Sequence, residues 1–414
     1  ASLFDASEVS VRDMSFREVR DEITRRIRSD LSDALGLSRL PAGQRRANVD
    51  WYAMATLLLD DKKMSAPGSS FIGSLMGTIE SRQEGYPAAA ATLKRIYEGY
   101  ASFDFLNELG GIPDDLAGVL AEAAIGSPAV CALRTYYGND QGSADLFWPF
   151  EFGYAFMTKM NTAAATVAVA VCTEKGQTAA AAHWKHVLSY CCEGNFQAML
   201  DEYWHLVFDG DVLSAHKSIV GQKLGNDKTP SLHKTDSRVE VETYSLFKEA
   251  ACGKGKRSAS KTIMRTSFAA GFMETKGVKA KGENRRSELR AAFNSPFRPF
   301  VLVSTSVGQE GLDFHQYCRR IVHWNLPSNP IDFEQREGRI NRYKSLAVRQ
   351  TLADRYEESA LGANDAWGEL FATADREENK KANAGERKSG LLPFWGVTAG
   401  EPRVPIERLV YNYP

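Results

Sequence analysis

The sequence lacks the features that mark several classes of protein. No apolar run approaches the roughly 18 residues of a membrane-spanning helix, and no basic-then-apolar signal segment opens the chain. A net charge of −1 over 414 residues gives no global sign of a nucleic-acid or membrane partner, so any such partner has to be argued from local charge. The remaining composition is ordinary for a globular protein, and the length allows two or more domains.

Patterns typical of disulfide frameworks and metal centres are also missing. The six cysteines show no C-x-x-C spacing, and in a chain of this length they indicate reduced, buried thiols of a cytoplasmic protein. The seven histidines show no ligand spacing beyond His183 and His186, which we interpret as structural residues. The sequence therefore predicts no metal site.

The first half of the chain has the periodicity of α-helices. Apolar residues recur there at steps of three and four with arginines between them: Phe16, Val19, Ile23, Ile27, Leu31 and Leu35. Further helices are predicted at 51–60, 86–100 and 113–124, each bounded by Gly, Pro or Ser clusters. This half indicates a helical domain or a helical insertion and names no reaction.

A basic segment follows at 253–290. It holds eleven Lys or Arg residues against three Glu, starting with Lys254, Lys256 and Arg257. Solvated loops are one interpretation of such a segment. The other is a surface that contacts nucleic-acid phosphates, because Lys and Arg displace counterions from the backbone.

The order of elements from 298 to 342 indicates a parallel sheet covered by helices. A short apolar strand at Phe300–Val303 leads into small polar residues and glycines, and a second strand at Ile321–Trp324 ends in a proline turn before a helix. Ligands of such sheets bind beyond the carboxyl ends of the strands. On the predicted helix, Gln335, Arg339 and Arg342 are spaced by four and three and share one face, which suits a polyphosphate.

"STSVGQEGLDF" followed by "QREGRINR" resembles motifs V and VI of superfamily 2 helicases and translocases. The residues between and before them resemble the SWI/SNF-type remodeller ATPases and the bacterial ATPases that recycle RNA polymerase. The resemblance covers about 285–345. It implies an α/β fold with a RecA-like parallel sheet and flanking helices, preceded by a mostly α-helical domain.

The resemblance also implies roles for particular residues. Arg339 and Arg342 match the arginines that reach the γ-phosphate of ATP held on a neighbouring domain, and such arginines stabilise transition-state charge. The other implied contacts fall into two groups. The nucleotide side comprises Gln335, Gly338, Gly311 and Asp313, with Gly338 allowing close approach of the helix. The nucleic-acid side comprises Ser304 and Thr305, to which the local charge adds Lys254, Lys256 and Arg257.

Half of an ATP site is missing from the sequence. There is no G-x-x-x-x-G-K-[ST], the loop whose amides and lysine hold the phosphates beside Mg²⁺. "LDEYWH" at 200–205 resembles both a helicase acidic box and a zinc-peptidase fragment. It follows no phosphate loop and lacks the first histidine of H-E-x-x-H, so we interpret Asp201 and Glu202 as a solvated helix face.

These observations predict the carboxyl-terminal motor portion of a larger ATP-dependent DNA or RNA translocase. Residues 1–175 are expected to form a helical accessory or inserted domain, 176–365 a RecA-like domain, and 366–414 a charged linker that enters a truncated segment. ATP and Mg²⁺ would be bound mainly by a first RecA-like domain absent from this chain. That domain and DNA or RNA are the expected partners, with no membrane. The alternative is a RecA-like module that binds nucleic acid or protein without catalysis.

Overall fold

The structure is a computed structural model. It describes residues 14–38, 48–63, 77, 87–101, 109–139, 147–161, 163–173, 183–207, 238–240, 263–265, 293–296, 301–303, 313–361, 363, 365–384 and 404–410. The described residues up to Gln197 belong to one compact unit, and those from Ala198 onward belong to a second. Each unit is described by itself below.

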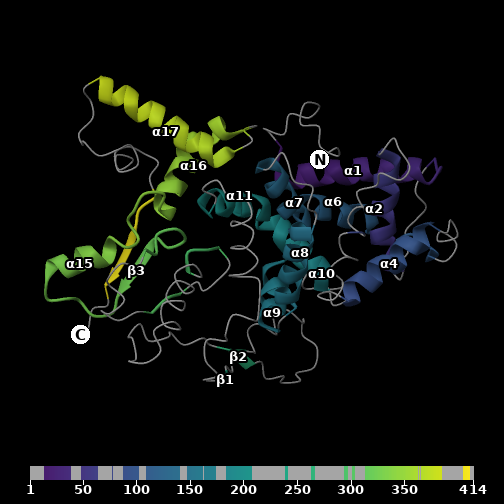
Figure 1. Ribbon diagram of the computed structural model, residues 1–414, viewed down its shortest axis with the longest axis horizontal. Coiled ribbons are helices and arrows are strands. Elements are labelled where there is room, and N and C mark those ends of the chain that lie inside the picture. Colours follow the sequence, from purple (N-terminus) through teal and green to yellow (C-terminus); the bar gives the residue numbers. More distant parts are fainter. Residues whose placement is uncertain are drawn as a thin grey trace. The chain divides into compact units, whose positions relative to one another are not determined.

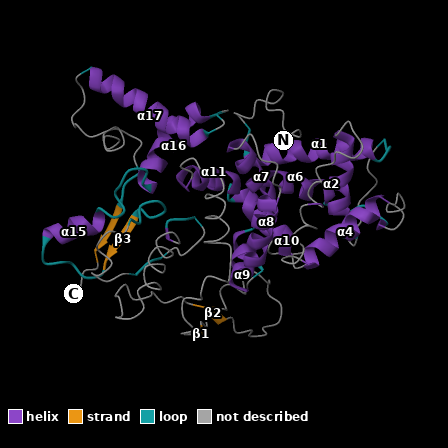
Figure 2. Cartoon of the chain, viewed as in Figure 1, coloured by secondary structure: helices purple, strands orange, loops and turns teal. Residues whose placement is uncertain are grey.

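The described elements of the first unit are all helices, as Figures 1 and 2 show. They are α1 (Phe16–Ala34), α2 (Asp50–Lys63), α4 (Pro87–Ala101), α6 (Leu116–Gly126), α7 (Pro128–Asn139), α8 (Phe147–Met160), α9 (Ala163–Cys172) and α10 (His183–Glu193). The helix α11 (Phe196–Val207) begins in this unit and continues into the second. The helices predicted from apolar periodicity are therefore confirmed over 16–34, 51–60, 87–100 and 116–124.

The helix α1 illustrates how the sequence sets these elements. Ser15 caps its amino end in a capping box, in which the Ser15 hydroxyl accepts from the Glu18 amide and the Glu18 carboxylate accepts from the Ser15 amide. The apolar stripe then buries Ile23, Ile27 and Leu31, each at most 3% exposed. The arginines between them remain on the other faces, so the helix is amphipathic as its spacing requires.

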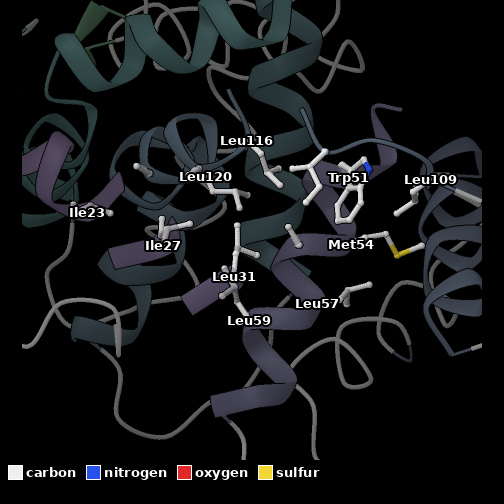
Figure 3. Close-up of a cluster of buried hydrophobic side chains, with 14 of the residues drawn as sticks. Ile23, Ile27, Leu31, Trp51, Met54, Leu57, Leu59, Leu109, Leu116 and Leu120 are labelled. Atoms are coloured by element: carbon white, nitrogen blue, oxygen red, sulfur yellow. The ribbon is translucent and has the colours of Figure 1, made fainter. Parts of the chain in front are cut away.

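The core of the first unit lies between α1, α2 and α6. Figure 3 shows Ile27, Leu31, Trp51, Leu116 and Leu120 among the side chains of this cluster. Burial of apolar area on this scale is the main favourable contribution to the stability of the unit.

One stretch of this unit, Leu116–Thr135, is long and apolar enough to cross a membrane by length and composition alone. This corrects the expectation that no apolar run approaches the length of a membrane-spanning helix. The stretch is interrupted at Ser127, the C-cap of α6, and 56% of it is buried inside the protein. Its residues Leu116, Ala117 and Leu120 belong to the core cluster, which is the position expected for core helices.

The helices α6 and α10 approach closely at Gly126. A Cβ atom there would lie 2.6 Å from Cys192 Sγ and 2.8 Å from its backbone nitrogen, so only glycine fits. The five described cysteines are free thiols. Cys131, Cys191 and Cys192 are buried as expected, whereas Cys172 is exposed and Cys318 is half-buried, which corrects the expectation of uniformly buried thiols.

The second unit mixes helices with two small sheets. Its described elements after α11 are β1 (Arg238–Glu240), β2 (Ile263–Arg265), β3 (Arg320–His323), α15 (Pro330–Glu337), α16 (Leu346–Ala360), α17 (Ala366–Asn383) and β4 (Glu407–Val410). The strands β1 and β2 pair antiparallel. The strands β3 and β4 pair parallel, and Figure 1 shows the yellow β4 beside the green β3.

The strands confirm one prediction and correct another. Strand β3 lies within one residue of the predicted strand at Ile321–Trp324. Residues 301–303, by contrast, form no strand, and Val301 and Val303 are more than three-quarters exposed. Strand β4 lies near the carboxyl end of the segment 366–414, for which no strand was predicted, and Glu407 fixes it by accepting from Arg319 and Arg320 at 2.6 Å each.

The expected charged linker is also corrected at its start, where α17 forms instead. Its apolar face packs Phe371 and Ala374 against Leu352 of α16. The charged residues that suggested a linker pair with one another along the helix, as Arg376 does with Glu369 and Lys380 does with Glu377. Pairs at helical spacing support a helix in a segment whose composition alone is typical of disorder.

Candidate functional site

The helix α15 is shorter than its sequence pattern predicted. Asn329 caps its start by accepting from the Ile331 amide, and Pro330 occupies the first turn. The helix ends at Glu337, with Gly338 as its C-cap. Gln335 therefore lies exposed in the last turn, whereas Arg339 and Arg342 lie in the turns beyond the helix. The expectation that all three share one helix face is corrected.

The close approach that we predict for the helix at Gly338 stays a prediction. Among the described residues, a Cβ atom there would meet only the carbonyls of Glu334 and Gln335, at 3.2 and 3.7 Å. Both carbonyls belong to the preceding helix. The glycine therefore serves the helix end, where a residue without a Cβ relieves crowding against the last turn.

Two contacts attach the end of α15 to the parallel strands. The Arg336 guanidinium donates to the carbonyl of Asn325 at 2.8 Å, just after β3. The Glu337 carboxylate pairs with Arg408 of β4 at 2.7 Å and lies 3.7 Å from His323 Nε2 at the end of β3. The end of α15, just before Arg339, is thus held to both strands.

His323 makes this attachment sensitive to pH. Its ring is 2% exposed and stacks on Phe333 at 4.3 Å. Burial lowers the pKa of His323 below its usual 6.5, although the nearby Glu337 carboxylate opposes the shift. The unfolded chain therefore takes up this proton at a higher pH than the folded chain does, so stability falls as the pH drops below about 6.5.

We expect thermal unfolding at pH 5.5, compared with pH 7.5, to show this loss. His323→Phe keeps a ring against Phe333 but cannot take up a proton, so its melting temperature should fall less on acidification. An equal loss in both proteins would show that His323 does not carry the effect.

The segments matching motifs V and VI meet beyond α15. The Arg342 guanidinium forms an ion pair with the Asp313 carboxylate, with 2.7 Å between Nη1 and Oδ1. The Phe314 amide donates to the carbonyl of Arg339 at 3.1 Å, and the Leu346 amide donates to the carbonyl of His315 at 2.9 Å. Residues 25 to 31 positions apart in the sequence are thus held by three contacts.

A small core and one buried amide support this junction. Phe293, Phe314 and Ile340 form a hydrophobic cluster beneath it. The Asn294 side chain, 7% exposed, donates to the carbonyl of Asp313 at 2.6 Å and accepts from the Gln316 amide at 3.4 Å. Asn294 was not predicted to be a site residue, because a lone asparagine before a Ser-Pro pair resembles an ordinary turn residue.

The arginine of the junction remains accessible. The Arg342 side chain is 47% exposed, and that of Asp313 is 21% exposed. The Arg342 guanidinium can thus meet an anion from solvent, whereas the Asp313 Oδ1 atom that it pairs with is itself buried. A planar guanidinium that keeps its charge and binds two oxygens at once suits a phosphate group. The described residues contain no cluster of three His, Cys, Asp or Glu side chains suited to a metal ion.

Several predicted site residues lie outside the described residues. They are Ser304, Thr305, Gly311, Lys254, Lys256 and Arg257. Their roles remain predictions from the sequence. Of the predicted nucleotide-side residues, the structure brings Asp313 together with Arg342 and places Gln335 and Gly338 in the elements leading to them.

Glu202 corrects the expectation of a solvated helix face. It lies on α11 and its side chain is 16% exposed, because it accepts at 2.6 Å from Nε of Arg349, whose side chain is fully buried. No local pattern points to this pair, since the two residues are 147 positions apart.

Comparison with known families agrees with the geometry of the junction. Residues 256–344 match the helicase conserved C-terminal domain. Over this stretch the chain therefore resembles a helicase C-terminal domain. The match spans the basic segment from Lys256 and both motif-like segments, and it ends at Lys344, just after Arg342. The family implies a RecA-like α/β fold, and the described elements within the matched residues are β2, β3 and α15.

A curated relative supports this helicase C-terminal domain over a short stretch. The chain is 45% identical over 42 residues to a protein described as the uncharacterized ATP-dependent helicase YqhH of Bacillus subtilis (strain 168). That alignment covers 10% of this chain and 7% of the relative. No solved structure matches the chain. The similarity of the domain to SWI/SNF-type ATPases stays a prediction from the motif residues.

Proposed function

We propose that this chain supplies the second motor half of an ATP-dependent helicase or translocase that moves on DNA or RNA. Arg339 and Arg342 contact the γ-phosphate of ATP held on a first RecA-like domain. Asp313 and Gly311 lie beside the nucleotide, and Gln335 contacts the nucleotide or the partner domain. The observation that carries this proposal is the ion pair between Arg342 and Asp313 at 2.7 Å.

That ion pair supports the proposal because it joins two segments that resemble helicase motifs separately. If Arg342 were an ordinary surface arginine, it would not need to contact Asp313 in the segment that resembles motif V. Here the guanidinium is oriented by Asp313 and by its own Nε, which donates to the carbonyl of Gly338 at 3.2 Å. An arginine oriented before the nucleotide arrives loses less side-chain entropy on binding it.

We assign the contacts on one side of the ATP molecule to this chain. ATP supplies the phosphoanhydride bond whose hydrolysis drives the motor, with Mg²⁺ shielding the phosphates. Arg342 and Arg339 supply positive charge at the γ-phosphate, and a fixed guanidinium stabilises the charge that develops there. The sequence contains no phosphate loop, so we assign the β-phosphate and Mg²⁺ contacts to the first RecA-like domain.

The same proposal assigns the nucleic-acid contacts. Ser304 and Thr305 contact backbone phosphates through hydroxyl or amide groups, and Lys254, Lys256 and Arg257 add positive charge. Contacts to the backbone position a strand without reading its sequence. A motor that moves along many sequences needs contacts of this kind.

We further propose that the motor domain extends beyond the boundary at 365 that the sequence suggested. The strand β4 pairs with β3, and Arg408 of β4 holds Glu337 beside Gly338. Helix α17 packs on α16, which begins directly after the arginine segment. The helices of the first unit form an accessory or inserted domain of the motor.

The first test is the activity of this chain alone. We expect no appreciable ATP hydrolysis, with or without nucleic acid, because the phosphate loop and metal carboxylates are missing from its sequence. Phosphate release should be measured for the chain and for its Arg339→Ala variant. Turnover that survives Arg339→Ala would place an ATP site elsewhere and contradict the proposal. Salt-sensitive nucleic-acid binding by an intact protein that hydrolyses no ATP would favour a non-catalytic module.

A further inference from the structure

Arg349 is the most deeply buried charged residue among those the structure describes. It lies in the first turn of α16, and its side chain is 0% exposed. A buried guanidinium is costly unless every part of it has a partner. Arg349 is satisfied by three elements that are far apart in the sequence.

The partners of Arg349 surround the arginine-bearing segment. Its Nη1 donates to the carbonyl of Lys344 at 2.5 Å, two residues after Arg342. Its Nη2 donates to the carbonyl of Gln316, three residues after Asp313. Its Nε donates to the Glu202 carboxylate on α11 at 2.6 Å.

An aromatic layer closes the site around Arg349. Its guanidinium lies over the Tyr317 ring, with 5.2 Å from Cζ to the ring centroid. Tyr203 of α11 packs edge-on against Tyr317 at 6.1 Å. Burial raises the pKa of Tyr317 well above its usual 10, so this ring stays neutral beneath the cation. The attraction between the cation and the ring strengthens when both are shielded from water.

Lys344 shows why the segment needs this support. Its φ is 55°, a left-handed backbone conformation that residues other than glycine rarely adopt. The carbonyl of this residue is the one that Arg349 holds. The turn that brings Arg342 to Asp313 is thus locked at its far end by Arg349.

We infer that Arg349, with Glu202 as its counterion, is a positioning residue that fixes the turn carrying Arg339 and Arg342 against the Asp313 segment. The two carbonyl contacts set the distance between the two segments, and α11 supplies the charge that keeps the guanidinium in place. This inference rests on the proposed function only for its effect on ATP turnover. Its structural part concerns this chain alone.

Hydrogen exchange of this chain tests the structural part without any nucleotide. Arg349→Lys keeps the positive charge beside Glu202 but cannot reach both carbonyls, so the turn should open more often. The amides of Ser345 and Leu346, which bond to the carbonyls of Arg342 and His315, should exchange at least about tenfold faster. Helix α1 in the other unit should exchange at an unchanged rate.

Two further variants keep this test decisive. Arg376→Lys changes an exposed arginine on α17 and should leave exchange at 345–346 unchanged. If Arg349→Lys fails to fold, Glu202→Gln serves instead, since it removes the counterion and keeps an acceptor for Nε. Unchanged exchange at Leu346 in a folded Arg349→Lys or Glu202→Gln protein would overturn the inference.

Kinetics of the intact protein test the link to turnover. Arg349→Lys should lower kcat for nucleic-acid-stimulated ATP hydrolysis by about 10- to 100-fold, with less than about a threefold change in KM for ATP. Combined with Arg342→Ala, it should cost less than the product of the two single losses, because one of the two arginines that Arg349 positions is already gone. A loss of kcat in the double variant equal to the product of the two single losses would overturn the positioning role. Full activity of Arg342→Ala alone would instead overturn the proposed function and leave the exchange result standing.

Discussion

Replacing Arg342 with alanine is expected to lower the nucleic-acid-stimulated ATPase of the intact protein by about 10³- to 10⁵-fold while leaving ATP binding largely intact. The guanidinium matters most when negative charge redistributes over the γ-phosphate oxygens, so its loss appears in kcat rather than in KM. Arg339→Ala should behave similarly. Steady-state hydrolysis and equilibrium ATP binding, measured on the same preparations, separate the two effects.

Lysine should replace either arginine poorly, because a point charge cannot bind two phosphate oxygens in the plane of a fork. Asn341→Ala is the matched control, since Asn341 is an exposed residue between the two arginines. It should keep near-normal turnover. If both single alanine variants also keep near-normal turnover, the arginines have no part in hydrolysis.

Nucleic-acid binding by this chain should weaken steeply with salt. The segment 253–290 carries a local excess of eight positive charges, eleven basic residues against three acidic ones, on a protein of net charge −1. Each neutralised phosphate contributes a log–log slope of about −0.9 on duplex and about −0.7 on a single strand. Six such contacts would lower affinity by about a thousandfold between 50 and 200 mM salt. Titrations against duplex and single-stranded DNA and RNA at both salt concentrations measure this.

Replacing Lys254, Lys256 and Arg257 together by alanine should weaken binding to every sequence alike. It should also reduce the log–log salt slope by up to the contribution of about three phosphate contacts. A control variant removes three exposed basic residues from helices elsewhere, Lys94, Arg376 and Lys380. It should keep the slope. Affinity that is absent at low salt, or equal at the two salt concentrations, would favour a module that binds a protein partner.

Much of the local structure follows from the sequence. The stripe from Ile23 to Leu31 can lie buried on one side only if the segment is a helix, and the structure buries it. The strand β3 was predictable because Ile321 and Val322 precede a proline turn. The motif resemblance assigned Asp313 and Arg342 to one nucleotide site, but it did not predict the ion pair that the structure shows between them.

Other features depend on contacts that no local pattern reveals. The helix α15 ends at Glu337, which pairs with Arg408, and the chain then turns toward Phe314. The sequence pattern predicts that Glu202 on α11 is solvated. It is largely buried because it pairs with Arg349, and that partner is distant in sequence.

Strand β4 shows the same limit at the carboxyl end. Its apolar residues, Leu409 and Val410, are few and follow a long charged stretch, so composition favoured a linker. The strand forms because Glu407 pairs with Arg319 and Arg320 and the backbone adds to β3. Parallel pairing joins segments that are remote in sequence, and short-range periodicity cannot predict it.

The most direct test of a γ-phosphate role for Arg342 is the affinity of the intact protein for ADP with aluminium fluoride, which mimics the transferred phosphoryl group. Arg342→Ala should weaken binding of ADP–aluminium fluoride by a factor close to its loss in kcat, while binding of ADP alone stays within about twofold of wild type. Equal affinities of wild type and Arg342→Ala for ADP–aluminium fluoride would contradict that role.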